Sequence, residues 1–468
     1  MVQMMKDIIK QETDIDQTSG TEIDSVALED LCRSLSNNDP QAAKIALASL
    51  HAADASDVIE QLSNDQLRQL ASFAPDVFTG EILAELSDPV LEKIVEILDA
   101  KTVADAIGAL ESDDAIQVVE ELEAEFRDEV LKSVNPKERQ ALETSLAFEP
   151  DSVGRLMQRE FVAVPAFFNV EQAINNIRQS DDTTMPDTFY EVYVVDPSYH
   201  VVGLVALPVL LRAKSNTPLS ELMSPVQIAV TQQTDKEDAA YMFEKYDLPS
   251  APVTDQSGRL VGMITIDDMV EVMHDEHTED LLSLAGVNEA GLGDTVKDVV
   301  LSRAPWLIVN LATAVLTSMV ISIFDASMEK IIALAVLMPI VASMGGNAAT
   351  QGLTVAVRAL ALREITKANA GRIIVREMVA GLVHGLIFAI IMGLVTFVWF
   401  KSLPLALILA SAMVINHLVA GFAGILVPLG LKRLGADPAV ASSVFVTTVT
   451  DIVGFFVFLG LAALVLVS

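Results

Sequence analysis

Five long apolar segments in the last third of the chain constrain its fold more than any other feature of the sequence. Each is long enough to cross a hydrocarbon core of about 30 Å, since a helix rises about 1.5 Å per residue. The sequence therefore predicts five membrane-spanning helices, over residues 305–324, 331–357, 374–400, 403–431 and 439–467.

The distribution of charge divides the chain near residue 300. The chain has 468 residues and a net charge of −34, and 51% of its residues are hydrophobic. Six of its 64 acids and ten of its 30 bases lie in residues 301–468, so the front part carries −38 and the rear part +4. An acidic front attracts cations and repels nucleic acid and anionic lipid. We expect a soluble front part, no nucleic-acid partner, and a transmembrane domain at 301–468 in the lipid bilayer.

The expected orientation follows from the termini and the connecting loops. No basic stretch followed by an apolar core begins the chain, so we expect no secretory signal and a cytoplasmic front part. Cys32 is the only cysteine, so no intrachain disulfide is expected. The basic loop at 358–376, together with Lys432 and Arg433, then faces the cytoplasm. This predicts a multi-pass protein of the cytoplasmic (inner) membrane with its C-terminus outside.

The front part begins with a polar, flexible segment at 1–24 and continues with helical periodicity over 25–147. Apolar residues recur there at three- and four-residue spacing. Two helix starts combine a capping residue with a proline, namely Ser87 before Asp88-Pro89 and Asn135 before Pro136. Short helices joined by acidic turns predict an all-α superhelical domain.

An internal repeat occupies residues 151–277. Asp196 and Asp255 are 59 residues apart, and so are Gly203 and Gly262. Each copy, about 151–214 and 218–277, is predicted to contain a strand, a helix, a hairpin and a helix. The repeat resembles a tandem pair of CBS domains, which sense small ligands and often adenine nucleotides. A purely structural dimerisation module is the alternative. Residues 278–300 are then predicted to form a connecting helix with acids in its first turn.

Asp451 is the only ionisable residue in the last apolar segment. A carboxylate near the bilayer centre costs about 2.5–3.5 kcal/mol on insertion scales and is normally kept for an ion or proton pathway. The hydroxyls of Thr447, Thr448 and Thr450 add oxygen ligands that suit a hard cation. The alternative is an ion pair with a Lys or Arg, but no apolar segment carries one in its interior. The sequence therefore predicts a cation pathway past Asp451.

The second apolar segment contains a proline, two adjacent glycines and two amides. Pro339 frees a backbone carbonyl, and Gly345-Gly346 permits close backbone approach or local unwinding. Inside a bilayer such irregularity survives where it is buried in protein or lines a wet path. Asn347 and Gln351 share one helical face. This favours pore lining, with tight helix packing through small residues as the alternative.

The other polar residues of the apolar segments indicate packing and no catalysis. Asn416 and His417 are expected to form hydrogen bonds between helices. The segments offer no His/Cys cluster, no nucleophile with a base and no P-loop, which disfavours a membrane enzyme. A receptor without transport would leave Asp451 unexplained.

Nearly the whole chain resembles the MgtE family of magnesium channels, with an acidic helical domain, a CBS pair, a connecting "plug" helix and five spans. The most specific residues are GGNAATQ at 345–351 and DPAVASSVFVTTVTDIVG at 437–454. The resemblance implies a homodimer with its pore between the subunits, Mg²⁺ as transported and regulatory ion, and ATP as a ligand of the CBS pair. It implies pore ligands at Asp451, Thr447 and Thr448, with Gly345, Gly346, Asn347, Gln351 and Ser443 lining the pore.

The resemblance also implies inhibitory Mg²⁺ sites among the helical domain, the CBS pair and the connecting helix. Gln117 stands where a second acid is expected, and Ser443 stands where Asn or Gly is more usual. The matching regulatory positions are Asp113, Asp235, Glu237, Asp247, Asp268, Glu271, Glu276, Glu279 and Asp280.

We therefore expect a Mg²⁺-selective channel that imports Mg²⁺ and that closes when Mg²⁺ binds its acidic domains. An acidic face that is merely solvated is the alternative to the sensor. A secondary transporter in which Asp451 carries a proton is the alternative to the channel. The oxygen ligands do not discriminate among Mg²⁺, Mn²⁺, Co²⁺ and Ca²⁺.

Overall fold

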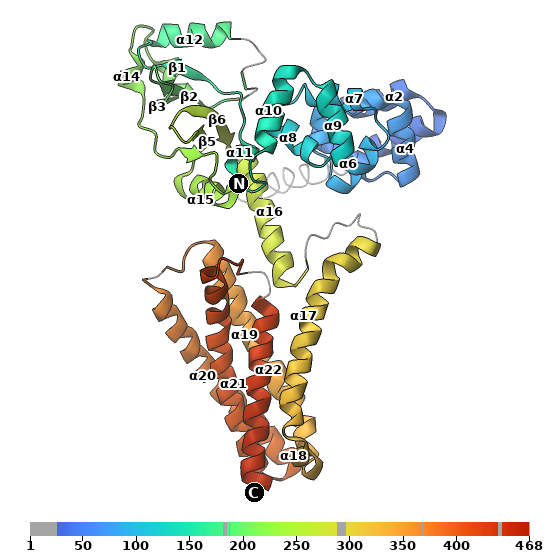
Figure 1. Ribbon diagram of the computed structural model, residues 1–468, viewed down its shortest axis with the longest axis vertical. Coiled ribbons are helices and arrows are strands. Elements are labelled where there is room, and N and C mark those ends of the chain that lie inside the picture. Colours follow the sequence, from blue (N-terminus) through green and yellow to red (C-terminus); the bar gives the residue numbers. More distant parts are fainter. Residues whose placement is uncertain are drawn as a thin grey trace, which may run out of the picture. The chain divides into compact units, whose positions relative to one another are not determined.

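The computed structural model describes residues 26–180, 185–186, 188–287, 296–366, 368–438 and 442–467. The chain forms two compact units, Met1–Met273 and His274–Ser468, and each is described by itself. Figure 1 shows the elements of both units in the order of the sequence.

The front of the first unit is a series of short helices, as the sequence predicts. Residues 26–37 form the first described helix. One continuous apolar core, with Leu31, Leu70 and Ile94 among its fully buried side chains, joins these helices. The others are α2 (Pro40–Ala48), α3 (Ala52–Glu60), α4 (Asn64–Phe73), the 3₁₀ turn η1 (Pro75–Val77), α5 (Gly80–Ala84), α6 (Asp88–Val95), α7 (Ala100–Ile107), α8 (Ser112–Glu120), α9 (Ala124–Ser133) and α10 (Pro136–Leu146).

Capping residues explain where several of these helices begin. Ser87 precedes α6, and Asn135 accepts hydrogen bonds from two backbone N–H groups in the first turn of α10. Proline occupies the first turn of both helices, which confirms the two predicted starts. Ser63 and Gln66 form a reciprocal capping box at the start of α4. These local bonds satisfy N–H groups that have no partner within the helix.

The second half of the first unit confirms the predicted repeat of strand, helix, hairpin and helix. In each copy a short parallel pair is extended by an antiparallel hairpin, giving the orders β1-β2-β3 and β4-β5-β6. The first copy contains α11 (Val153–Leu156), β1 (Ala163–Pro165), α12 (Val170–Gln179), β2 (Glu191–Val195), β3 (Val201–Ala206) and α13 (Leu207–Arg212). The second contains α14 (Leu219–Leu222), β4 (Val230–Thr231), α15 (Lys236–Tyr246), β5 (Ser250–Thr254), β6 (Leu260–Thr265) and α16 (Ile266–Leu284).

The two copies also share an irregularity and are bonded to each other. The register of the hairpin shifts at Val194/Val195 in the first copy and at Val253/Thr254 in the second. Between the sheets, the buried hydroxyl of Tyr193 donates a 3.0 Å hydrogen bond to Ser250 Oγ. The pair is therefore a single packed body with a polar contact at its centre.

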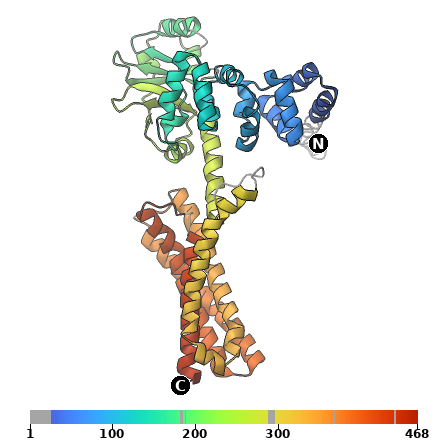
Figure 2. The ribbon, with the colours of Figure 1, turned by 45° about the vertical axis from the view of Figure 1, so that its right-hand side comes forward.

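Among the described residues of the second unit, five helices are long and apolar enough to cross a membrane, as the sequence predicts. Figure 2 shows this bundle turned by 45° from the view of Figure 1. Its elements are α17 (Val296–Ser322), α18 (Asp325–Lys330), α19 (Ala333–Ala361), α20 (Ala370–Phe400), α21 (Leu403–Arg433), α22 (Ser442–Ala462) and the π-helical end η3 (Ala463–Val467).

Two elements of this region differ from what the sequence indicates. Helix α16 begins at Ile266, directly after β6, and runs through Thr278, where the connecting helix is predicted to start. Part of the predicted connecting segment, residues 288–295, lies outside the described residues. The short helix α18 between the first two spans is absent from the prediction.

Glycines allow α20 and α21 to approach each other closely. A Cβ added at Gly381 would lie 2.5 Å from the backbone oxygen of His417, and one at Gly421 would lie 2.6 Å from that of Glu377. Real Cβ atoms do not approach an oxygen so closely, so larger residues would push the two backbones apart. Small residues at such crossings are typical of membrane helix packing.

Candidate ion pathway and acidic face

Asp451 lies on α22 and is half-buried in the bundle. Among the described residues, its carboxylate makes no hydrogen bond and no ion pair. Its position on a membrane helix agrees with the prediction. A carboxylate in a membrane helix is costly, and such residues usually pair with another group or mark an ion or proton pathway.

Two threonines share the face of α22 that carries Asp451, since they precede it by three and four residues. The hydroxyl of Thr447 donates to the backbone oxygen of Ser443 at 2.8 Å, and that of Thr448 donates to the oxygen of Val444 at 2.6 Å. Because the hydrogens are held within the helix, the oxygen lone pairs stay available to an outside donor or cation. The half-buried Ser443 contributes its carbonyl to this arrangement.

A polar stripe on α19 lies near this face of α22. A Cβ added at Gly346 of α19 would lie 3.7 Å from Cγ2 of Thr447, so the two helices meet at this level. The predicted residues Asn347 and Gln351 are exposed in the single chain. Sequence reasoning missed that the stripe is longer, although helical spacing from Asn347 would have indicated it. Its exposed members are Ser343, Asn347, Thr350, Gln351 and Thr354.

Gly345 of α19 and the adjacent polar residues Asn416 and His417 of α21 make contacts inside the bundle. Gly345 is buried against Asn416, whose amide donates a 2.9 Å hydrogen bond to the Val341 oxygen of α19. The predicted interhelical bond is therefore confirmed for Asn416. It is wrong for His417, whose Nδ1 bonds to the Met413 oxygen of its own helix at 2.9 Å. The ring of His417 stacks on Phe388 of α20 with centroids 5.5 Å apart.

In the first unit, acids of two helices form the feature that we call the acidic face. Asp113 and Asp114 lie in the first turn of α8, and Asp267 and Asp268 lie in the first turn of α16. Glu271 follows one turn later on α16. Negative charge is favourable at a helix N-terminus. Here, however, two such termini present their acids to each other.

The crowding is visible in the pKa values of these carboxyls. Burial, and after it the charge of Glu271, raises the pKa of Asp114 to about 6. Burial also raises the pKa of Asp268 to about 6, although hydrogen bonds from the Thr265 hydroxyl and N–H oppose the shift. The pKa of Asp113 is raised well above its usual range by burial and by the charge of Asp268. Such a site favours the arrival of positive charge.

The other predicted regulatory acids are spread over both units. Asp235 caps α15 by accepting from the Glu237 N–H at 2.9 Å, and Asp247 ends the same helix with a left-handed backbone (φ 51°). Glu276, Glu279 and Asp280 lie on the part of α16 that belongs to the second unit. Within the described ranges, no three His, Cys, Asp or Glu side chains are already arranged as a metal site.

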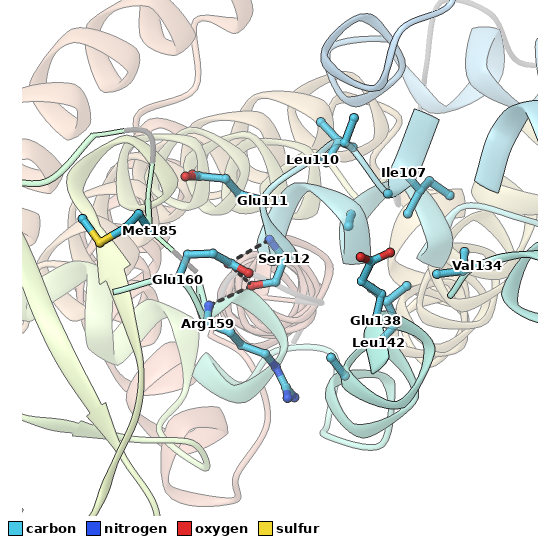
Figure 3. Close-up of a pocket in the computed structure, with 14 residues that line it drawn as sticks. Ile107, Leu110, Glu111, Ser112, Val134, Glu138, Leu142, Arg159, Glu160 and Met185 are labelled. Carbon is cyan, nitrogen blue, oxygen red and sulfur yellow. Dashed lines mark hydrogen bonds between the residues drawn. The ribbon is translucent and has the colours of Figure 1, made fainter. Parts of the chain in front are cut away.

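A cavity of about 330 Å³ opens within the first unit where α8 and α10 meet the start of the CBS pair, lined in part by Ile107 and Glu138. Figure 3 shows Ser112, Arg159 and Glu160 joined by hydrogen bonds on its wall. Glu160 accepts from the Ser112 hydroxyl at 2.7 Å and from its N–H at 3.2 Å, and so caps α8. No sequence signal indicates this contact, because the partners are 48 residues apart.

Comparisons with known proteins match successive parts of the chain to domains of one family of transporters. The family profile of MgtE, described as a divalent cation transporter, matches residues 338–461. The MgtE intracellular N domain matches residues 50–151, and a CBS domain matches residues 219–275. The chain is 30% identical over 443 residues to the magnesium transporter MgtE of Thermus thermophilus, which covers 93% of this chain and 98% of that one. It is 34% identical over 319 residues to the magnesium transporter MgtE of Enterococcus faecalis, which covers 68% and 70%.

Two solved structures are each similar to about half of the chain. One is the cytosolic domain of the Mg²⁺ channel MgtE in complex with ATP, with 27% identity, a TM-score of 0.48, and coverage of 52% of this chain and 99% of that one. The other is the soluble part of a magnesium transporter, with 24% identity, a TM-score of 0.47, and coverage of 54% and 99%.

Proposed function

Because the chain belongs to the MgtE family of divalent cation transporters, we propose that it conducts Mg²⁺ across the cytoplasmic membrane as a homodimeric, Mg²⁺-selective channel. The observation that carries the proposal is the carboxylate of Asp451, which stands without a cation partner among the described residues of a membrane helix. The threonines on its face and the polar stripe of α19 support a wet path beside it.

The chemistry of this path suits an ion that keeps its water. Mg²⁺ dehydrates reluctantly, so it enters with most of its hydration shell, and the oxygens of Asp451, Thr447 and Thr448 accept hydrogen bonds from that water. Outer-shell capture is weak enough to allow release, as conduction requires. In a homodimer, two copies of Asp451 face one path, and their combined charge favours a divalent over a monovalent cation.

The decisive experiment compares Asp451→Asn with the wild-type chain in liposomes that contain a Mg²⁺-sensitive dye. We expect Mg²⁺ uptake to be lost while the purified variant elutes and melts as the wild type does. Asp325→Asn on α18 is the control, because it removes one acid outside the spans. Normal uptake by Asp451→Asn would overturn the assignment.

The same preparation separates a channel from a proton-coupled transporter. A channel gives Mg²⁺ current that follows voltage without a pH gradient. Flux that requires a pH gradient, and that acidifies or alkalises the lumen in proportion, would instead make Asp451 a proton carrier.

We further propose that the acidic face senses cytosolic Mg²⁺. Burial, together with the charges of neighbouring acids, raises the pKa values of Asp114 and Asp268, and a bridging divalent cation would relieve the cost of keeping both carboxyls charged. Asp113 and Glu271 would complete the oxygen ligands that such an ion prefers. Ions that bind the compact state better shift the population toward it and close the channel at high Mg²⁺.

A charge-neutralising variant tests whether three further acids of α16, outside the acidic face, take part in sensing Mg²⁺. Glu276→Gln/Glu279→Gln/Asp280→Asn removes three charges from α16, and we expect current that persists at high cytosolic Mg²⁺. Glu125→Gln/Asp128→Asn/Glu129→Gln on α9 makes the same change of charge elsewhere and is the control. Unchanged inhibition in the α16 variant would contradict the role of these acids.

Two further parts of the proposal concern orientation and nucleotide. Basic loops at 358–376 and 432–433 support a cytoplasmic front part and an external C-terminus. A C-terminal reporter that is active only outside the membrane tests this orientation. ATP binding by the CBS pair rests on the family resemblance, and calorimetry on the full chain tests it.

A further inference from the structure

We propose that Asn416 is a positioning residue that clamps α22 to α19 and so fixes where Asp451 lies. The inference deepens the proposed function, on which it rests. Helices α19, α21 and α22 pack against one another in the second unit (Figure 1). Asn416 of α21 reaches both of the other helices at one level, and the contacts on each side are unusually close.

On the α19 side, Asn416 makes a hydrogen bond to one backbone carbonyl and packs directly against a glycine. The side chain of Asn416 is only 1% exposed, and its Nδ2 donates to the Val341 oxygen at 2.9 Å. A Cβ added at Gly345 would overlap this same Nδ2. The amide therefore occupies the volume of a missing side chain on α19.

On the α22 side, Gly454 likewise leaves room for the side chain of Asn416. A Cβ there would lie 2.7 Å from Nδ2 and 3.2 Å from Oδ1 of Asn416. Gly454 follows Asp451 by three residues, so the two are neighbours on the same side of α22. Contact at Gly454 thus sets both the rotation and the height of α22 at the proposed ion-binding carboxylate.

The energetics favour a role in position over a role in stability. A hydrogen bond between membrane helices contributes only modestly to stability on average. Against this, Oδ1 of Asn416 is buried without a hydrogen-bond partner among the described residues, and burying such an atom without a partner is unfavourable. An apolar side chain would fill the space without that cost. The amide nevertheless gives what an apolar group lacks, a directional contact that selects one register between α19 and α22.

The test measures ion selectivity and affinity together with folding. Asn416→Leu keeps the approximate size and removes the donor. Gly454→Ala adds the clashing Cβ, and Gly460→Ala is its control on the same helix, since no atom lies nearer than 3.8 Å to a Cβ there. A misplacement of about 1 Å can cost about 100-fold in rate. We expect at least a tenfold loss of Mg²⁺ flux in the first two variants, with a changed half-saturating Mg²⁺ concentration, and near-normal flux in Gly460→Ala.

A double variant keeps the test decisive if single variants fold poorly. Asn416→Ala vacates the volume that a Cβ at position 454 would enter, so Asn416→Ala/Gly454→Ala should lose less than the two single effects combined. Additive losses would overturn the clamp, and so would wild-type flux, half-saturation and Mg²⁺/Ca²⁺ preference in Asn416→Leu. Asp451→Asn is measured in parallel. If it keeps uptake, the proposed function fails, whereas its loss beside a normal Asn416→Leu refutes the clamp alone.

Discussion

The side-chain amide of Gln117 on α8 donates a 3.0 Å hydrogen bond to the carboxylate of Glu271 on α16. The bond crosses the acidic face, where most other groups carry negative charge. A neutral donor at this position attracts the facing carboxylate without any metal ion. Part of the contact between the helical domain and α16 is therefore independent of Mg²⁺ in this chain.

Replacing that donor by an acid should increase the dependence on Mg²⁺. Gln117→Glu removes the hydrogen bond and places a second carboxylate against Glu271, at a cost of about 1–3 kcal/mol without divalent cations. We expect thermal unfolding of the first unit at a lower temperature in chelator, and recovery on adding Mg²⁺. Gln140→Glu on the exposed side of α10 is the control. Equal melting of both variants in chelator would argue against the contact.

Acidification should replace divalent cations in part. The pKa of Asp114 and of Asp268 is about 6 in the folded chain, above the ordinary value of 3.8, so the folded state binds more protons between about pH 4 and 6. The cost of these charges is thus present above pH 6 and is relieved as pH falls through 6. In chelator we expect a higher melting temperature at pH 5 than at pH 7.5, and a smaller difference in Asp114→Asn. A melting temperature that is flat with pH, or lower at pH 5, would contradict this assignment.

The cap from Glu160 should be a measurable link between the helical domain and the CBS pair. Ser112→Ala removes the 2.7 Å bond to the Glu160 carboxylate and the acceptor for the Arg159 N–H. Hydrogen bonds to charged groups contribute about 1.5–3 kcal/mol, and 1 kcal/mol corresponds to about 2–4 °C for a unit of this size. We expect a loss of several degrees by calorimetry, against little change for the exposed Ser133→Ala. Equal melting temperatures would exclude the link.

The close approach of α20 and α21 should tolerate no side chain at Gly421. A Cβ there meets the Glu377 oxygen at 2.6 Å, whereas one at Gly430 of the same helix meets no atom within 4 Å. Gly421→Ala should therefore lower the yield and thermal stability of the detergent-solubilised protein, and Gly430→Ala should not. Similar behaviour of the two variants would show that the helices separate without cost.

Much of this architecture could be predicted because it depends on residues that are close together in the sequence or on a repeated spacing. Apolar length alone identifies the five spans, and caps such as Asn135 before Pro136 identify helix starts. The 59-residue spacing of Gly203 and Gly262 predicts two copies of one unit, down to the hairpin in each. Asp451 could be identified from the sequence alone because it is the only ionisable residue in a long apolar segment.

The remainder depends on contacts between residues that are distant in sequence. The hydrogen bond between Gln117 and Glu271 joins residues 154 positions apart, and no pattern in the sequence predicts it. The contacts of Asn416 need a glycine on each of two other helices, Gly345 on α19 and Gly454 on α22. The sequence predicts that His417 beside Asn416 bonds between helices, but its Nδ1 bonds to a carbonyl of its own helix and its ring stacks on Phe388. Spacing on one helix cannot decide among such partners.

Helix α17 is held differently from the rest of the bundle. Only 6% of its most apolar window is buried inside the described chain, against 50% for α21. Wherever a second subunit does not cover it, α17 faces acyl chains along most of its length, so a change in bilayer thickness can alter its tilt more easily than that of the packed helices. The structure of the protein then depends on the lipid. In membranes of short and long acyl chains, α17 would take different tilt angles, while the closely packed α20 and α21 would keep theirs.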